Sequence, residues 1–309
     1  MHSTGTRRRG LPRVRTLIAL LAVMIPVAAL GIASPAMAEP KGIFKIFNDC
    51  PTTEPGVTLC SYAETTSGEF AIGSTKVPIL KPIILQGGAI PTGNEENGKE
   101  YFLVPAKDGN SLSKTELNVP GGLLDFINCE EITGKGFFET IERETCKAFF
   151  ENKTTGVTAT TELVANTKNP AILDLRALTT ETGTALTLPV RIHLKNPLLG
   201  GSCYVGSEAS PIQLHLTTGA SGTKHGSKGT PETLIEKEQR FLRVSSNSLV
   251  DNAFTVPVAE GCGEFFSFLI DPIVDGKLGL PSKAGNNVAI LNGTLNASAA
   301  EAVIASESF

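Results

Sequence analysis

Hydrophobic and polar positions alternate most clearly between residues 184 and 218. From 186 to 194 every second side chain is apolar, and the positions between carry polar side chains or a proline. Successive side chains of a β-strand leave opposite faces, so this period of two indicates a half-buried strand. A shorter alternation covers 212–216, after a Pro- and Gly-rich break that contains Cys203. The pattern predicts two strands that can pair, with His193 and His215 on their polar faces.

Further runs of strand character recur along the chain, and turn residues separate them. They cover 69–72, 77–85, 101–104, 157–164, 249–258, 265–270 and 288–295. Prolines within 77–85 predict an edge strand or a bulged one. In 137–150, charged residues alternate with apolar ones at helical spacing, which predicts a short amphipathic helix. The sequence therefore predicts a mainly β fold, antiparallel and β-sandwich-like, with one short helix.

The first 38 residues have the order of a secretory signal peptide. Five arginines precede an apolar run, and Ala36-Met37-Ala38 forms a small-residue cleavage site before Glu39. The alternative, an uncleaved membrane anchor, fits less well because the apolar run is short for a span. We expect cleavage between Ala38 and Glu39 and no integral membrane span in the processed chain.

The polar, Thr-rich segment 165–183 is the best candidate for an internal boundary. It would separate an N-terminal β-rich half, 39–164, which includes the helix over 137–150, from a C-terminal β-sandwich-like half, 184–309. The length of the processed chain also suits one large all-β domain.

All six cysteines lie after the signal peptide. An even number of cysteines in an exported chain implies disulfide bonds, although sequence alone does not choose the pairing. We expect neighbours in the sequence to pair. The expected bonds are Cys50–Cys60, Cys129–Cys146 and Cys203–Cys262. The alternative is a zinc site, which the absence of any C-x-x-C motif disfavours.

The charge of the chain argues against nucleic acid as a partner. The chain has 27 basic and 31 acidic residues, and the signal peptide holds five of the basic ones and no acidic one. The processed chain therefore carries 22 basic residues and a net charge of −9. An acidic chain without basic clusters is poorly suited to nucleic acid or to anionic membranes. We expect a secreted, extracellular or envelope-associated protein whose partner there is not identified by the sequence.

Catalytic motifs are weak in this sequence. The G-x-S-x-G elbow of serine hydrolases is absent. Ser111 and Ser221 begin S-x-x-K matches, but the S-D-N and K-T-G partners of that motif are missing. Acidic residues that could serve glycoside hydrolysis are present, although the chain has no Trp and three Tyr to form sugar platforms. These acidic candidates are Glu130, Glu131, Asp271 and Asp275. We assign no catalytic residue and no cofactor.

A metal site is the sharper chemical hypothesis. His193 and His215 lie on polar faces of strands that can pair, and imidazole is the commonest side-chain ligand of transition metals. His225, in a Gly/Ser/Thr-rich segment over 219–231 that predicts an exposed loop, could add a third ligand. No carboxylate stands at a fixed short spacing from these histidines, and no H-E-x-x-H motif occurs. Two histidines on a solvated sheet face are the simpler interpretation, and we assign no metal ligand.

Three pieces of the sequence have a familiar form: 68–74 (GEFAIGS), 197–207 (PLLGGSCYVGS), and 279–295, from GLPS to LNGTL. In these pieces the chain resembles an uncharacterised family of secreted proteins from high-GC Gram-positive, actinobacterial species. The resemblance spans most of the processed chain, and its motifs are structural rather than catalytic. It implies export and a bacterial source, and it brings no activity, cofactor or functional residue.

The sequence favours a non-enzymatic extracellular or cell-envelope protein with a structural, adhesive or binding role. One alternative is a secreted hydrolase that acts on envelope or environmental polymers. A second alternative is a module that binds a metal or a small ligand.

Overall fold

A computed structural model describes residues 38–94, 100–120, 122 and 156–309. Several sequence predictions lie outside these residues: the signal peptide over 1–38 except its last residue, the helix over 137–150, the Cys129–Cys146 bond, and the candidates Glu130 and Glu131.

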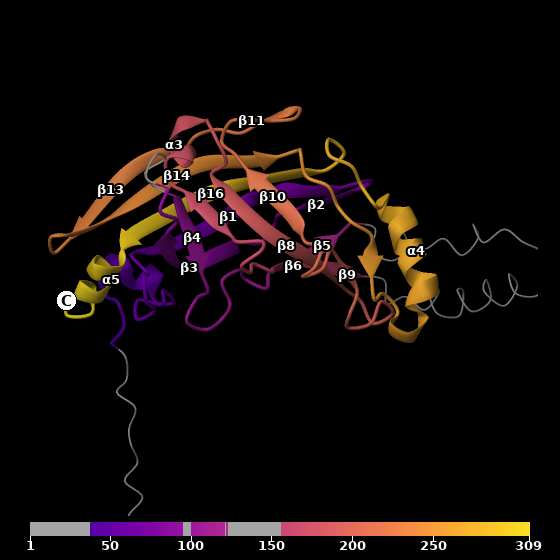
Figure 1. Ribbon diagram of the computed structural model, residues 1–309, viewed down its shortest axis with the longest axis horizontal. Helices are drawn as coiled ribbons and strands as arrows, with labels where there is room; N and C mark the ends of the chain where they lie inside the picture. The colour runs from indigo at the N-terminus through magenta and orange to yellow at the C-terminus, as the bar shows by residue number, and fades with distance from the viewer. Residues whose placement is uncertain (1–37, 95–99, 121, 123–155) are drawn as a thin grey trace, which may run out of the picture. The chain divides into compact units, whose positions relative to one another are not determined.

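The described chain is mainly β-structure with a few short helices (Figure 1). The strands are β1 (Leu59–Ile72), β2 (Thr75–Pro78), β3 (Ile83–Pro91), β4 (Glu100–Val104), β5 (Glu116–Val119), β6 (Val157–Leu163), β7 (Ile172–Asp174), β8 (Leu186–Lys195), β9 (Tyr204–Val205), β10 (Ile212–Leu216), β11 (Ala220–Ser221), β12 (Lys224–His225), β13 (Thr230–Glu236), β14 (Gln239–Asp251), β15 (Ala259–Glu260) and β16 (Val288–Ala299). The α-helices are α3 (Ala177–Thr180), α4 (Ser267–Leu278) and α5 (Ala300–Ser306), and the 3-10 helices are η1 (Gly42–Phe47) and η3 (Glu264–Phe266). Among the described helices, none is long and apolar enough to cross a membrane.

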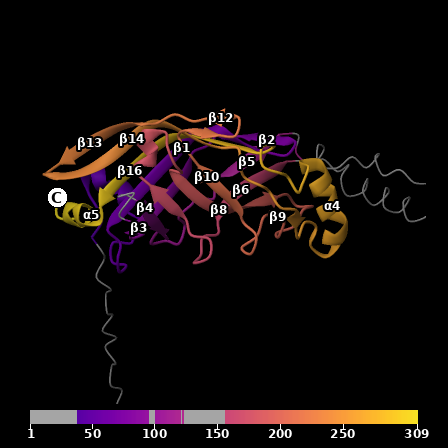
Figure 2. The ribbon, with the colours of Figure 1, turned by 45° about the horizontal axis from the view of Figure 1, so that its top comes forward.

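The two strands predicted from the alternation between residues 184 and 218 are confirmed as β8 and β10. In β8 the apolar positions are buried, whereas Arg191, His193 and Lys195 are only partly buried. β10 lies beside β8 (Figure 2) and pairs with it antiparallel, with Leu214 opposite Leu188. The two strands pair as their sequence predicts, because the alternation places both apolar sets on the core side of the sheet.

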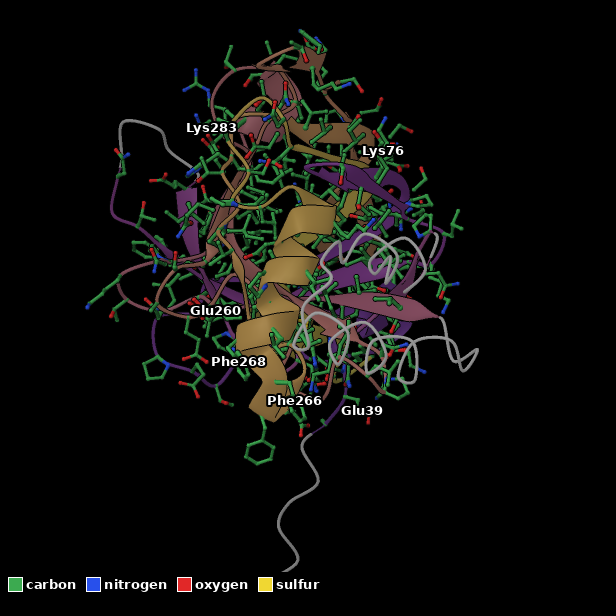
Figure 3. All side chains as sticks on the ribbon, turned by 90° about the vertical axis from the view of Figure 1, so that its right-hand side faces the viewer. Glu39, Lys76, Glu260, Phe266, Phe268 and Lys283 are labelled. Carbon is green, nitrogen blue, oxygen red and sulfur yellow. A yellow bond between two sulfur atoms is a disulfide. The ribbon has the colours of Figure 1, made fainter. Side chains whose placement is uncertain are left out.

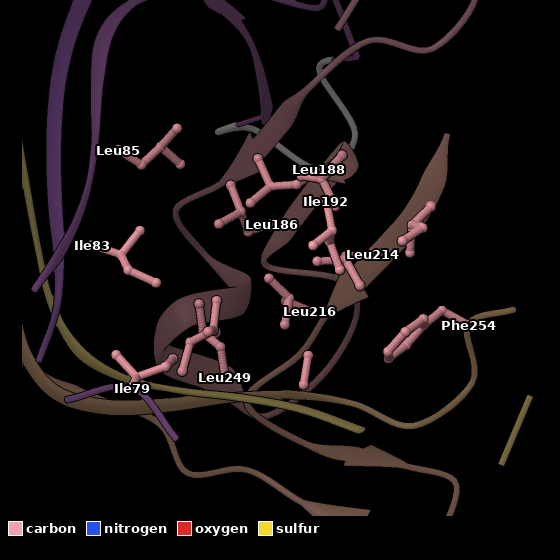
Figure 4. Close-up of a cluster of buried hydrophobic side chains, with 14 of the residues drawn as sticks. Ile79, Ile83, Leu85, Leu186, Leu188, Ile192, Leu214, Leu216, Leu249 and Phe254 are labelled. Carbon is pink, nitrogen blue, oxygen red and sulfur yellow. The ribbon is translucent and has the colours of Figure 1, made fainter. Parts of the chain in front are cut away.

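Within the described residues, fourteen strands form one large antiparallel sheet. Its longest path runs β13-β14-β16-β1-β3-β4-β7-β8-β6-β5. β10, which pairs with β8, also reaches β14, because Thr217 and Val250 exchange backbone hydrogen bonds of 3.0 and 2.8 Å. The sheet therefore bends around one main core, in which Leu85, Leu214 and Leu249 come from distant strands (Figure 4). The antiparallel, sandwich-like class is confirmed, with the opposing layers supplied by one sheet.

The two sequence halves expected on either side of 165–183 do not form separate domains. Residues 38–309 form one compact unit. β1 pairs with β16, and β6 pairs with β8, so strands from both halves complete each other's hydrogen bonds. The segment 165–183 contains β7 and α3 rather than a linker.

A smaller second core joins the start and the end of the described chain. Phe44 and Phe47 of η1 are buried against Phe241 of β14. The ring of Phe44 meets Phe241 edge-to-face at 5.5 Å and meets Phe309 in the same manner at 6.0 Å. Val303 of α5 is fully buried in the same cluster. These contacts hold the two ends of the described chain together.

Two disulfide bonds are present in the described residues. Cys50 is bonded to Cys60 beside the second core, and Cys203 is bonded to Cys262 beside the main core. Each bond joins neighbouring cysteines of the sequence, which is the order that we expected. The disulfide-stabilised character of the fold is therefore confirmed.

Two predicted strands are wrong or too long. The sequence predicts a strand over 265–270, but η3 and the start of α4 occupy this region. A short apolar run does not by itself separate a strand from a helix. The strand predicted over 249–258 ends at Asp251, because the buried side chains of Asp251 and Asn252 bind neighbouring loops there.

The proline-containing run 77–85 is split rather than bulged. β2 ends at Pro78 and β3 begins at Ile83, with Pro82 in the break. Proline has no N–H to donate to a ladder, so the break falls where the sequence cannot complete the pairing.

Candidate functional site

Charged side chains gather on the outer face of β8, the face that the alternation leaves polar. Arg191 lies 2.8 Å from Glu162 of β6 and 3.7 Å from Glu208. Lys195 lies 2.8 Å from Glu116 of β5 and is the main cause of the lowered pKa of that carboxyl. These ion pairs link β5, β6 and β8, although their partial exposure limits what they add to stability.

His193 lies between these two cations on β8 and exposes 13% of its side chain. Its Nδ1 is 3.5 Å from a carboxylate oxygen of Glu162, and its ring stacks on Tyr204 with the centroids 4.4 Å apart. The Arg191 guanidinium lies 4.3 Å from the centre of the same tyrosine ring. Among the described residues, no hydroxyl or thiol hydrogen-bonds to the His193 ring, whose Nε2 is buried and unpaired. His193 therefore forms a packing contact with Tyr204 across β8 and β9.

The candidate histidines do not come together. His193 is opposite Tyr204 on β9, whereas His215 is opposite Thr187 on β8. Positions 193 and 187 of β8 are six residues apart, which corresponds to about 20 Å along the strand. His225, placed in the β11–β12 hairpin, has its Nδ1 2.7 Å from a backbone carbonyl oxygen. In the part of the chain that the structure describes, no three His, Cys, Asp or Glu side chains form a group that could hold a metal ion.

The carboxylates of α4 hold the loop that precedes the helix. Asp271 accepts backbone N–H groups of Cys262 at 2.7 Å and of Gly261 at 3.2 Å. Asp275, one turn further on, accepts the N–H of Ala259 at 2.7 Å. Partial burial is the first cause of the raised pKa of Asp275, and the neighbouring Asp271 adds to it. Both carboxylates therefore have a structural role in fixing α4.

The serines of the two S-x-x-K matches are also part of the framework. The Ser111 hydroxyl accepts the N–H of Ala106 at 3.0 Å. The Ser221 hydroxyl donates to the buried Asp251 at 3.1 Å and accepts the N–H of Asn252 at 2.9 Å. These contacts assign both hydroxyls to loop fixation.

The raised pKa of Asp275 gives a prediction on stability. The folded protein holds this proton to a higher pH than the unfolded chain, so the folded state loses stability as pH rises from the unfolded pKa through the folded pKa. In Asp275→Asn the amide oxygen can still accept the N–H of Ala259, and the charge is gone. The free energy of unfolding of the variant, minus that of the native chain, is therefore expected to be larger at pH 7 than at pH 3. Urea unfolding at both pH values measures this; a relative loss at pH 7 would contradict the assignment.

Phenylalanine side chains are exposed at the start of α4. Phe265, Phe266 and Phe268 expose 91%, 57% and 71% of their surfaces, and Leu269 is also exposed. We call these four residues the phenylalanine face. Figure 3 shows Phe266 and Phe268 at one end of α4, with Glu260 on the same side of the molecule. A cluster of large exposed apolar side chains on a folded protein commonly marks an interaction surface.

The phenylalanine face is fixed firmly to the fold. Immediately before it, Cys262 is bonded to Cys203, and Gly263 donates its N–H to the carbonyl of Leu199 at 2.8 Å. Asp271 binds the same loop from within α4. The inner side of the helix buries Val274 in the main core. The apolar side chains are thus presented on a rigid support, which lowers the entropy lost on binding.

This surface was missed from the sequence because a strand was predicted over 265–270, where η3 and α4 lie. The sequence feature that could have indicated it is the i, i+3, i+4 spacing of Phe265, Phe268 and Leu269, which places them on one face of a helix. Burial of Ile270, Ile273 and Val274 on the opposite side needed the tertiary structure.

Comparison of the chain with protein-family models, curated proteins and solved structures found no match.

Proposed function

We propose that this chain is a secreted, non-enzymatic protein of the extracellular space or cell envelope, and that it acts by binding a partner protein through the phenylalanine face. The observation that carries the proposal is the exposure of Phe265 on η3 and of Phe268 on α4, two helices that follow the disulfide-bonded Cys262.

A protein partner suits this face better than a lipid surface. Glu260 and Glu264 are both exposed next to the phenylalanine face. The anionic lipid headgroups of a membrane attract basic rather than acidic side chains, so these carboxylates oppose attachment to such a membrane. An apolar patch with basic residues at its rim would complement the face in both hydrophobicity and charge.

Secretion is supported by the signal-peptide pattern before Glu39, by the two disulfide bonds and by the resemblance to secreted actinobacterial proteins. We expect the protein isolated from the producing cell to begin at Glu39 and to occur outside the cytoplasm. N-terminal sequencing of protein from the medium and from the envelope fraction measures this. A cytoplasmic protein that retains Met1 would contradict export.

The binding role is tested by removing the apolar side chains. Because hydrophobic contacts resist salt, the native protein is expected to remain with its partner in the envelope fraction through a high-salt wash. The double variant Phe265→Ser/Phe268→Ser is expected to be released. The matched control is Leu80→Ser, since Leu80 exposes 79% of its surface outside this face. Equal retention of all three proteins would contradict binding through the phenylalanine face.

A further inference from the structure

A groove of about 490 Å³ lies between β4 and the segment that follows β6. Phe102 of β4 and Leu163 of β6 line it together with Ala165 and Thr167, which are exposed. Its walls are mainly apolar, and none of the residues that line it is ionisable. Its volume falls within the range of small-molecule sites in proteins.

The inner part of the groove approaches the main core. Leu85 of β3 lines the groove and also lines a smaller apolar cavity of about 60 Å³ within the folded sheet. Leu85 is itself buried. A ligand in the groove would therefore lie with one side against the core of the protein, where apolar groups bind most favourably.

Ser61 of β1 places a hydroxyl group in the lining of this mainly apolar groove. It is only 5% exposed and lines the groove, yet its hydroxyl makes no hydrogen bond to any other residue that the structure describes. The hydroxyl oxygen is not among the fully enclosed polar atoms without a partner, so it is open to the groove, where a hydrogen-bonding group of a ligand can take the place of water. The hydroxyl therefore marks a position for a hydrogen-bonding group.

We infer that this groove is a binding site for a small, neutral and mainly apolar molecule that carries one hydrogen-bonding group. The apolar part contacts Phe102, Leu163 and Leu85, and the polar group pairs with Ser61. The ligand is neutral because the groove has no ionisable side chain to compensate a buried charge. This site is separate from the phenylalanine face and does not depend on the function proposed above.

The charge preference is measured with two related probes. N-phenyl-1-naphthylamine is neutral at pH 7, and 8-anilino-1-naphthalenesulfonate is a similar aromatic amine with a negative charge. Fluorescence titration of the full processed chain is expected to show saturable binding of the neutral probe at one site. The anionic probe is expected to bind at least about ten-fold more weakly. No saturable binding of the neutral probe, or equal affinity for both probes, would overturn the inference.

Variants locate the probe. Ala165→Trp is expected to fill the groove from its rim and abolish binding of the neutral probe. Phe102→Ala removes one wall without adding volume, so it tests the site if the tryptophan variant does not fold, and it is expected to weaken binding about five-fold. Phe265→Ser/Phe268→Ser is the control, because exposed phenylalanines could bind the dye themselves. Loss of binding in this control, with binding unchanged in Phe102→Ala, would overturn the inference.

The role of Ser61 is measured with a second pair of ligands. 1-Naphthol carries a hydroxyl group that naphthalene lacks, and both compete with the neutral probe for an apolar site. Ser61→Ala is expected to weaken 1-naphthol about five-fold and to leave naphthalene unchanged. An equal effect on both competitors, or no effect on either, would contradict a hydrogen bond at Ser61.

Discussion

Gly293→Ala is expected to lower the free energy of unfolding by about 3 kcal/mol or more. Gly293 lies in the middle of β16, between β1 and β14. A Cβ at this position would overlap the backbone carbonyl oxygen of Glu64 on β1. Backbone atoms inside a sheet cannot move aside as the end of a side chain can, so the three central strands would have to separate.

The need for glycine at 293 follows from irregularities in both neighbouring pairings. β1 has an extra residue between Thr65 and Ser67, and β14 has an irregularity between Val244 and Asn247, both at the level of Gly293. Such bulges bend and twist the strands that carry them and bring backbones close together. The substitution therefore tests the register at the centre of the sheet.

The matched control is Gly276→Ala. Gly276 lies within α4, where an added Cβ would meet open space. Alanine in a helix interior is favoured over glycine, so this variant is expected to gain up to about 1 kcal/mol. Urea unfolding of both variants measures the contrast. A native-like midpoint for Gly293→Ala would contradict the register of β1 against β16.

Removal of the Cys203–Cys262 bond is expected to have the largest effect of any disulfide variant within the described residues. The bond closes a sequence separation of 59 residues, for which loss of chain entropy in the unfolded state corresponds to about 4 kcal/mol. The Cys50–Cys60 bond closes a separation of 10 residues, which corresponds to about 3 kcal/mol. The two double alanine variants, compared by urea unfolding, measure this order.

Loss of the Cys203–Cys262 bond is also expected to loosen the phenylalanine face. Cys262 directly precedes the loop and helix that carry this face, whereas Cys60 lies in β1. Limited proteolysis is therefore expected to cut within 263–270 faster in Cys203→Ala/Cys262→Ala than in Cys50→Ala/Cys60→Ala. Equal cleavage in the two variants, or a larger loss of stability in Cys50→Ala/Cys60→Ala, would contradict the role given to the Cys203–Cys262 bond.

The strands with regular alternation were predictable from sequence, and those with irregular turns were not. β8 and β10 have strict alternation, which gave both strands and the basis for their pairing. β13 and β14 meet at Lys237 and Glu238, which both have positive φ. Such a turn normally favours Gly or Asn, so the hairpin had no turn signal in the sequence.

The local sequence pattern also could not predict which strands pair when they are far apart in the sequence. β1 pairs with β16 over most of its length, although more than two hundred residues separate the two strands. No local signal links them, and this pairing joins the two sequence halves into one sheet. The boundary expected at 165–183 rested on composition alone, which does not report strand partners.

The candidate functional residues likewise depend on the tertiary structure. The alternation placed His193 and His215 on polar faces, but the register decides that they lie at different levels of the sheet. The phenylalanine face depends on which side of α4 packs against the core, and that is a tertiary property. Sequence therefore located the residues, and the structure separated the framework from the exposed surface.

Photo-cross-linking at position 268 detects a partner protein bound at the phenylalanine face. A photoreactive phenylalanine analogue replaces Phe268 in the producing cell, and the control carries it at Leu80, which is 79% exposed against 71% for Phe268. We expect a discrete protein adduct at position 268 that is absent at position 80 and is lost when Phe265→Ser is added. Adducts only with lipid, or the same pattern at both positions, would contradict a protein partner at the phenylalanine face.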